Sequence, residues 1–405
     1  MKNISNRNYF LLFLDTVLYT NAMAFLSINA VIPYFLNKLG ASTIEISLAS
    51  VLVSVCALIT QPLFSGMVLK LKYKLKPFVK ILFTQRIIFL IFVMFIPAIC
   101  KISSTLMIVM FLIFWGIFNL FVGSYSPFYN LIISKLVPLN QRGRLLGFAG
   151  AFGNFIAIGT SMLIGILLKN VSYPYNYTII FSLGIIVLLL DVLDFNLMKD
   201  DEPDKVADKE IKYVEYLKLL PKILKDNNKF AHMVAGFTFC TVTNVSLAFY
   251  TLYAIRTYHA AATEIAVFTS ITVLVNIFAS MLLGVIADKF GHKYVLQVSA
   301  LCGLTAGIIV IGITGIFSVY LAFILTTFCV CGYNLSSSML IIQEAPREEL
   351  TMYISTNILI TQIISSIVLL LSGYIIDKFS FQPIFLLTII TGTAAYLMFR
   401  LFDKK

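Results

Sequence analysis

Long apolar stretches recur along the whole chain, and each has roughly the length that an α-helix needs to cross a membrane, about 20 apolar residues. Sixty per cent of the 405 residues are hydrophobic and 12% are charged, which no soluble domain of ordinary composition matches. The chain is therefore expected to be an all-α membrane protein with twelve transmembrane helices. The stretches lie at residues 9–36, 44–69, 78–99, 103–135, 145–168, 176–198, 230–255, 264–287, 294–314, 317–342, 351–376 and 381–401.

The cationic residues alternate between sparse and dense connecting segments. With a cytoplasmic N-terminus, 24 of the 30 Lys and Arg residues fall on the inner side, five fall outside, and Arg86 lies within a span. Cytoplasmic loops carry such an excess of Lys and Arg. The pattern predicts a multi-pass protein of the cell (inner or plasma) membrane with both termini in the cytosol. The net charge of +11 is then explained by contact with anionic lipid heads, and no nucleic-acid partner is expected.

One long polar segment divides the spans into two sets of six. It predicts an N-terminal bundle at residues 1–198, a cytoplasmic linker at 199–228 and a C-terminal bundle at 229–405. The linker stretch 206–224 is expected either to form an amphipathic surface helix or to be a solvated tether. The halves resemble each other in the same direction: Glu45 and Glu264 are 264 − 45 = 219 residues apart, and Gly123 and Gly332 are 332 − 123 = 209 apart. Such a parallel duplication is typical of transporters built from two like halves.

A short polar break between the eighth and ninth stretches carries the most informative motif. It contains Gly284, Asp288, Lys289, Gly291 and Lys293 in the pattern Gly-x-x-x-Asp-[Lys/Arg]-x-Gly-x-[Lys/Arg]. This motif resembles the loop between the second and third spans of each half of a major facilitator superfamily transporter.

A second segment supports the same resemblance. Arg142-Gly143-Arg144 is similar to the family's link between the fourth and fifth spans, and the likeness covers essentially the whole chain. On these motifs the chain is identified as a member of this superfamily, of a bacterial efflux type. The subfamily stays open because Lys70 replaces the aspartate of the first-half motif, and because Asn119 stands where many proton-coupled members have arginine.

The resemblance implies a cytoplasmic gate that closes when loops of the two halves meet. Asp288 would then contact Arg142, Arg144 and the positive end of the fifth helix, which helix dipoles favour. Lys70 would contact Glu348 and Glu349. The alternative is that these loop charges only fix the topology.

Ionisable side chains inside a membrane span are costly and are functional candidates by default. Asp15 in the first span and Arg86 in the third are the proton-coupling candidates, because the resemblance places the first span along the cavity. For the first residue, the alternatives are a structural ion pair of Asp15 with Arg86 or a polar contact near the membrane interface. A packing pair of Arg86 with Asp191 is the alternative for the second.

Uncharged polar and aromatic residues of the first, fourth, seventh and tenth spans are the candidates for contact with a substrate. For each of them, packing between helices is an equal alternative. The cavity has no cluster of Arg or Lys, so a neutral or cationic, partly apolar solute fits best. The candidates are Tyr19, Asn21, Asn29, Asn119, Tyr125, Tyr129, Asn130, Asn244, Tyr250, Tyr333 and Asn334.

These features predict a secondary active transporter that exports a small organic, drug-like or peptide-like compound in exchange for protons by alternating access. Proton-coupled uptake of a sugar, nucleoside or similar nutrient is the second interpretation, and a membrane sensor that does not transport is the third. No enzyme is expected, because zinc-protease, nucleophile-elbow and nucleotide-binding motifs are missing from the sequence. The expected partners are the small-molecule substrate, the proton and the bilayer. The expected protein is a monomer without cofactor or metal.

Overall fold

In the computed structural model, the regular structure of the described residues is entirely helical. These residues are 6–199, 203, 224, 225, 227–344 and 350–401. The chain divides into two compact units. The first comprises residues 1–41, 52–210 and 262–270, and the second comprises 42–51, 211–261 and 271–405. The predicted surface helix at 206–224 lies almost wholly outside the described residues.

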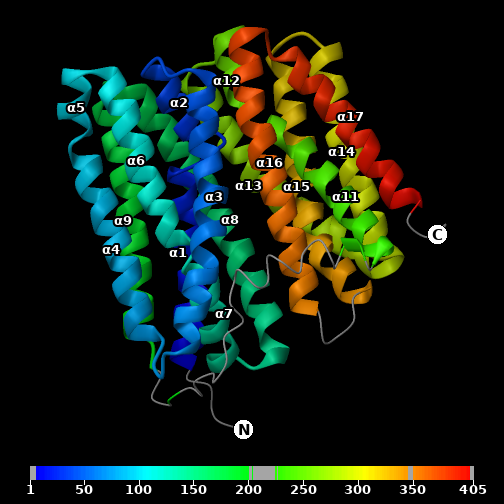
Figure 1. The fold of residues 1–405 in the computed structure, drawn as a ribbon. Helices are drawn as coiled ribbons and strands as arrows, with labels where there is room; N and C mark the ends of the chain where they lie inside the picture. Colours follow the sequence, from blue (N-terminus) through cyan, green and yellow to red (C-terminus); the bar gives the residue numbers. More distant parts are fainter. Residues whose placement is uncertain (1–5, 200–202, 204–223, 226, 345–349, 402–405) are drawn as a thin grey trace. The chain divides into compact units, whose positions relative to one another are not determined.

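Within each half of the sequence, the helices follow each other with short connections (Figure 1). Those with most of their length in the first unit are α1 (Asn6–Phe25), α2 (Val31–Lys38), α3 (Thr43–Leu69), α4 (Leu75–Met94), α5 (Ile96–Ile102), α6 (Ser104–Val122), α7 (Tyr125–Leu136), α8 (Leu139–Asn170) and α9 (Tyr175–Leu197). Those of the second unit are α11 (Asn228–Thr243), a short 3-10 turn η1 (Asn244–Ser246), α12 (Leu247–Tyr258), α13 (Ala262–Phe290), α14 (His292–Gly312), α15 (Ile316–Glu344), α16 (Leu350–Lys378) and α17 (Gln382–Leu401). The first turns of α3 belong to the second unit, and the first turns of α13 belong to the first.

Eleven helical segments of the described chain are long and apolar enough to cross a membrane, and they correspond to the second through twelfth predicted stretches. The first predicted stretch, 9–36, is not one continuous helix, because it is broken between α1 and α2. Pro33 explains the break, since it has no N–H to donate to the carbonyl of Asn29, four residues earlier. A proline is tolerated in the first turn of the helix that follows.

The fourth predicted stretch is interrupted in the same way. Helix α6 ends at Val122 and α7 begins at Tyr125, with Pro127 in the first turn of α7. Gly123, at the break, approaches α3 so closely that an added Cβ atom would lie 2.0 Å from the Thr60 hydroxyl oxygen. The break therefore coincides with a tight contact between helices that only glycine allows.

Each unit has its own core. In the first, α1 packs against α8 and α9, and α4 packs against α6 and α9 (Figure 1). Phe78 lies at the centre of this packing, with its ring stacked on Phe128 and edge-on to Phe195. In the second, α14 packs against α15 and α17, and α11 packs against α16 and α17. Its core includes Phe237 and Phe399, whose ring centroids are 5.7 Å apart.

Large apolar side chains are also exposed on several helices. Phe155 of α8, Met281 of α13 and Ile390 of α17 are each about two thirds exposed, at 68%, 69% and 66%. Water would penalise so much uncovered apolar surface, whereas lipid would not. The expectation of an all-helical membrane protein is thus met by the helices and by their surface.

Candidate functional site

Three charged side chains meet inside the first unit. Asp15 of α1, Arg86 of α4 and Asp191 of α9 are 0%, 1% and 0% exposed. A guanidinium nitrogen of Arg86 forms an ion pair and hydrogen bond with the Asp191 carboxylate. The packing pair of Arg86 with Asp191 is therefore present, and it anchors α4 to α9. We call these three residues, together with Tyr125 of α7, whose hydroxyl contacts Asp15, the buried polar cluster.

The carboxylate of Asp15 is hydrogen-bonded to a tyrosine, whereas the sequence suggested Arg86 as an alternative partner. The hydroxyl of Tyr125 donates to its carboxylate, with distances of 3.1 and 3.2 Å to the two oxygens. The Asp15 carboxyl group also lies within interaction range of the Asp191 carboxyl group. Tyr19 and Tyr129 stack on either side of Tyr125, with ring centroids 5.2 and 5.1 Å away. The tyrosine that contacts Asp15 is therefore itself held in place by two neighbouring tyrosine rings.

The cluster has unused hydrogen-bonding capacity. The Nε and Nη1 atoms of Arg86 and the Oδ1 atom of Asp191 are buried and have no hydrogen-bond partner among the described residues. Arg86 lines a small, mostly apolar cavity together with Tyr19, Gln85 and Tyr125. Buried polar atoms normally find a partner, so this cavity can receive a small polar group or a proton-carrying water molecule.

Charge counting indicates what the cluster can do chemically. With both carboxylates ionised, one guanidinium leaves a net charge of −1 on three buried side chains. A single proton on either carboxyl group makes the cluster neutral. Neighbouring carboxylates disfavour a second charge, so the geometry supports binding and release of one proton.

Several of the predicted cavity residues of the first unit have their polar atoms occupied by protein. Asn21 donates to the Val17 and Gly153 carbonyls and accepts from Thr160, at 2.8, 3.1 and 2.7 Å. Asn119 is 2% exposed and donates to a carbonyl of its own helix. Asn21 therefore joins α1 to α8, whereas Asn119 is bonded within α6.

The remaining candidates of the first unit keep some exposure. Asn29 lies at the break between α1 and α2, Tyr19 and Tyr129 are half-buried, and Asn130 is exposed on α7. Tyr129 shares a hydrogen bond with Thr16 at 3.4 Å.

The candidates of the second unit divide similarly. Tyr250 is fully buried, with its hydroxyl hydrogen-bonded to Ser246 and Thr326 at 3.1 and 3.2 Å, so it serves packing. Asn244 directly follows α11, and its Oδ1 atom has no partner among the described residues. On α15, Tyr333 is half-buried and Asn334 is exposed.

The predicted gate residues lie at helix ends. Asp288 and Lys289 are exposed in the last turn of α13, with Gly284 one turn earlier, and Lys293 is in the first turn of α14. Lys70 is exposed in the turn after α3.

Glu348 and Glu349 lie outside the described residues. The two proposed gate contacts stay predictions.

The two arginines of the fourth-to-fifth link have contacts within the first unit. Arg142 donates to the Ser134 and Val137 carbonyls, at 2.6 and 2.9 Å, and so satisfies the C-terminus of α7. Arg144 lies over the ring of Phe148 at 5.8 Å and is exposed. Arg144 is therefore the more available cation of the two for a gate contact.

Gly291 has a structural role that the motif alone does not explain. It precedes α14 with φ 91° and ψ 164°, a region that is essentially restricted to glycine. We expect Gly291→Ala to lower the free energy of unfolding in detergent micelles by about 1–3 kcal/mol.

Gly284→Ala is the matched control, because Gly284 is helical and an added Cβ atom would have nothing within 4 Å. Chemical unfolding followed by circular dichroism compares the two variants. If the two variants are equally stable, the backbone angles at position 291 do not require glycine.

One polar contact of the second unit was not singled out from the sequence. Asp377, at the end of α16, contacts the start of α3 and Arg256 of α12. A sequence signal was present: Gly373-Tyr-Ile-Ile-Asp377-Lys-Phe repeats the Gly-x-x-x-Asp-Lys-Phe pattern that begins at Gly284.

Comparison with known proteins agrees with this architecture. The sequence matches the Major Facilitator Superfamily profile over residues 14–255 and 231–405, so the chain belongs to this superfamily of secondary transporters, which are not enzymes. No curated protein sequence is similar enough to count as a match.

Solved structures show the same fold at low sequence identity. The chain is similar to a point mutant of the nucleoside transporter NupG, with a TM-score of 0.73, 13% identity, and 99% and 100% of the two chains covered. It is also similar to a bacterial homolog of the human lysosomal transporter Spinster, with a TM-score of 0.71, 13% identity, and 100% of this chain and 98% of that chain covered. For a point mutant of the E. coli fucose:proton symporter FucP, the TM-score is 0.61 at 18% identity, with 97% of this chain and 98% of that chain covered.

Proposed function

We propose that this transporter is driven by protons and that Asp15 is the group that binds and releases them. The observation that carries the proposal is the buried polar cluster, in which two carboxyl groups share one guanidinium and one tyrosine hydroxyl. Ionisable groups buried among the helices of a membrane protein typically mark ion pathways.

The two carboxyl groups have different roles in this proposal. Asp191 is neutralised by its ion pair with Arg86. Asp15 accepts from the Tyr125 hydroxyl, which is an uncharged donor, so its charge is less well compensated. A proton bound at Asp15 removes the uncompensated charge, and its release restores a negative site beside the cavity that Tyr19 lines.

The substrate is proposed to be a small organic, drug-like or peptide-like compound that is partly apolar and neutral or cationic. Tyr19 and Tyr125, whose rings are stacked, line the small, mostly apolar cavity beside the buried polar cluster. Aromatic faces attract cations and apolar groups. An anion would face the net negative charge of the cluster. Export in exchange for protons, by one chain acting as a monomer, fits these properties best.

The predicted cytoplasmic gate completes the proposed cycle. Asp288 with Arg144, and Lys70 with Glu348 and Glu349, would stabilise the outward-open state and separate when the protein opens to the cytosol. The termini are proposed to be cytoplasmic, with the linker 199–228 joining the bundles on that side.

Proton-coupled nutrient uptake is the second candidate. It is favoured by the fold that the chain shares with a nucleoside transporter and a fucose:proton symporter, although the identities are too low to carry their substrates over.

The two directions can be separated in bacterial cells that lack their own major exporters. Production of the protein should lower the accumulation of ethidium, an aromatic cation, and a protonophore should abolish the difference. Raised accumulation of labelled uridine or fucose, abolished in the same way, would favour uptake. If none of the three probes moves in a proton-dependent manner while the protein is present in the membrane, the proposal fails for these solute classes.

A further inference from the structure

The structure assigns to Asp377 and Arg256 a gating role at the predicted external face, where they latch the start of α3 to the end of α16. Helix α3 comes from the first half of the sequence, whereas Arg256 and Asp377 come from the second. The inference is independent of the coupling ion and of the direction of transport.

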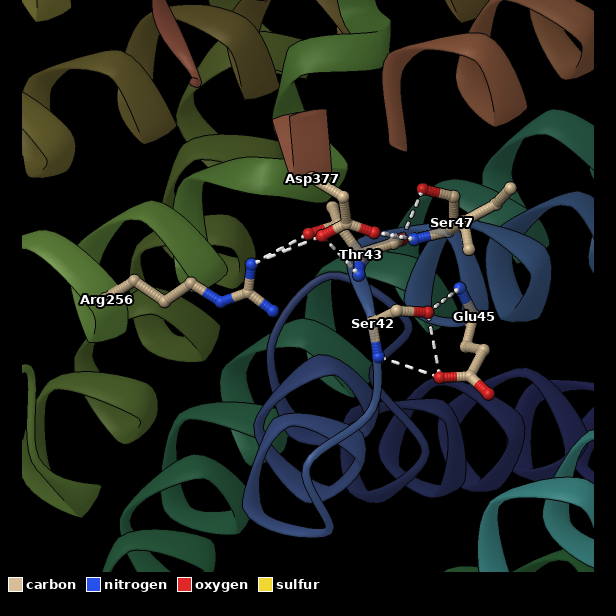
Figure 2. Close-up of polar contacts among 7 residues, drawn as sticks. Ser42, Thr43, Glu45, Ser47, Arg256 and Asp377 are labelled. Atoms are coloured by element: carbon tan, nitrogen blue, oxygen red, sulfur yellow. Dashed lines mark hydrogen bonds and ion pairs between the residues drawn. The ribbon is translucent and has the colours of Figure 1, made fainter. Parts of the chain in front are cut away.

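Asp377 accepts two backbone hydrogen bonds at the first turn of α3 (Figure 2). The Thr43 amide donates to its Oδ1 atom at 3.0 Å, and the Ile44 amide donates to its Oδ2 atom at 3.1 Å. The first amides of a helix have no partner within the helix. A carboxylate at this end is stabilised by the helix dipole and by charge-assisted hydrogen bonds.

Arg256 joins the same contact from α12. Its Nη1 atom donates to the Thr43 hydroxyl at 2.8 Å and lies 3.6 Å from the Asp377 carboxylate (Figure 2). The side chains of Arg256 and Asp377 are 34% and 27% exposed, so water can replace their bonds when the contact opens. A latch must be reversible in this way, and a fully buried pair would not be.

The backbone amides on either side of Thr43 and Ile44 are hydrogen-bonded without Asp377. Ser42 and Glu45 form a capping box: the Ser42 amide and hydroxyl donate to the Glu45 carboxylate at 2.7 and 2.8 Å, and the Glu45 amide donates to the Ser42 hydroxyl at 3.3 Å (Figure 2). The amides of Thr43 and Ile44, which lie between them, donate to Asp377.

The backbones of α3 and α16 touch just below the latch. A Cβ atom added to Gly373 would lie 2.2 Å from the Ser47 hydroxyl oxygen and 3.0 Å from the Ile44 Cα atom. Ser47 is 1% exposed. We call this glycine contact, between Gly373, Ile44 and Ser47, the seam.

The internal repeat supports a functional role for the seam, because a second copy exists in the first unit. A Cβ atom added to Gly165 of α8 would lie 2.7 Å from the Ala266 Cβ atom of α13. Gly165 and Gly373 are 373 − 165 = 208 residues apart, and Ser47 and Ala266 are 266 − 47 = 219 apart. These separations match those of the two sequence halves.

The charged residue four positions after the glycine sets the two copies apart. Four helix ends carry a Gly-x-x-x-charge pattern, with lysine in both first-half copies and aspartate in both second-half copies. A lysine cannot accept hydrogen bonds from helix amides, so of the two seam copies the one at α16 alone can form the carboxylate latch. The four pairs are Gly66 with Lys70, Gly165 with Lys169, Gly284 with Asp288, and Gly373 with Asp377.

The state of the seam can be measured without knowing the substrate. Ser47→Cys places a thiol in the seam with little change in volume, and a membrane-impermeant maleimide added to intact cells reports its external accessibility. Labelling is counted above that of the parent, which lacks this cysteine. Asp377→Asn and Arg256→Gln should each raise the labelling rate about tenfold, because loss of a charged contact shifts the population toward the open seam.

Two further variants separate charge from sterics. Gly373→Val leaves every charge in place but fills the seam, and it should raise labelling in the same way. Lys378→Gln, which changes the neighbouring exposed charge, should label at the parental rate. Unchanged labelling in Asp377→Asn, Arg256→Gln and Gly373→Val, with normal amounts of protein in the membrane, would overturn the latch, as would a thiol at position 47 that only a permeant maleimide reaches.

Discussion

Asp15→Asn abolishes proton-driven transport in our account, while exchange of substrate across the membrane continues. Asparagine can still accept the Tyr125 hydrogen bond, now 3.1 Å long to one Asp15 oxygen, so the fold is retained. It cannot bind and release a proton, so ethidium accumulation in cells that produce the variant should equal that of cells without the protein. The exchange of labelled for unlabelled ethidium in proteoliposomes should stay close to the parental rate.

Glu45→Gln is the matched control for this prediction. Glu45 lies in the same half of the sequence, but its carboxylate serves the helix cap, and glutamine can accept the same hydrogen bonds. Proton-driven transport should survive this change. Loss of coupling in Glu45→Gln, or its survival in Asp15→Asn, would remove Asp15 from the proton role.

Arg86→Met should be the most destabilising single change in the buried polar cluster. It leaves the Asp191 carboxylate buried without its cation, and such broken pairs cost about 3–5 kcal/mol. We expect the free energy of unfolding in detergent micelles to fall by about this amount. Chemical unfolding followed by circular dichroism measures the change.

The double variant Arg86→Met/Asp191→Leu provides the control, because it replaces the whole pair by apolar groups of similar size. Such replacements are often neutral or stabilising, so stability should return close to the parental value. A single variant as stable as the parent would show that water already reaches Asp191 and that the cluster is not sealed from solvent.

Local sequence patterns predicted the features that depend on neighbouring residues. The second to twelfth spans, for example, follow from runs of apolar residues along the chain. The glycine at the tight contact of the fourth span, Gly123, is also visible as one of a pair related by the repeat.

Features that depend on helix rotation or on distant contacts could not be predicted in the same way. An ion pair of Asp15 with Arg86 was one alternative, but the residue that donates a hydrogen bond to the Asp15 carboxylate is Tyr125, 110 residues away. The bond from Thr43 to Asp377 joins residues 334 positions apart. Composition and spacing do not determine which faces of two helices meet, because several rotations bury the same apolar surface.

The most direct test of the central claim is infrared difference spectroscopy of the reconstituted protein while the bulk pH is changed. The C=O stretching band of a protonated carboxyl group reports whether a buried acid exchanges a proton with the solution. Our account predicts a pH-dependent band in the parent and in Glu45→Gln that is missing in Asp15→Asn. The same band in Asp15→Asn would contradict it, because the exchanging proton would then be bound elsewhere.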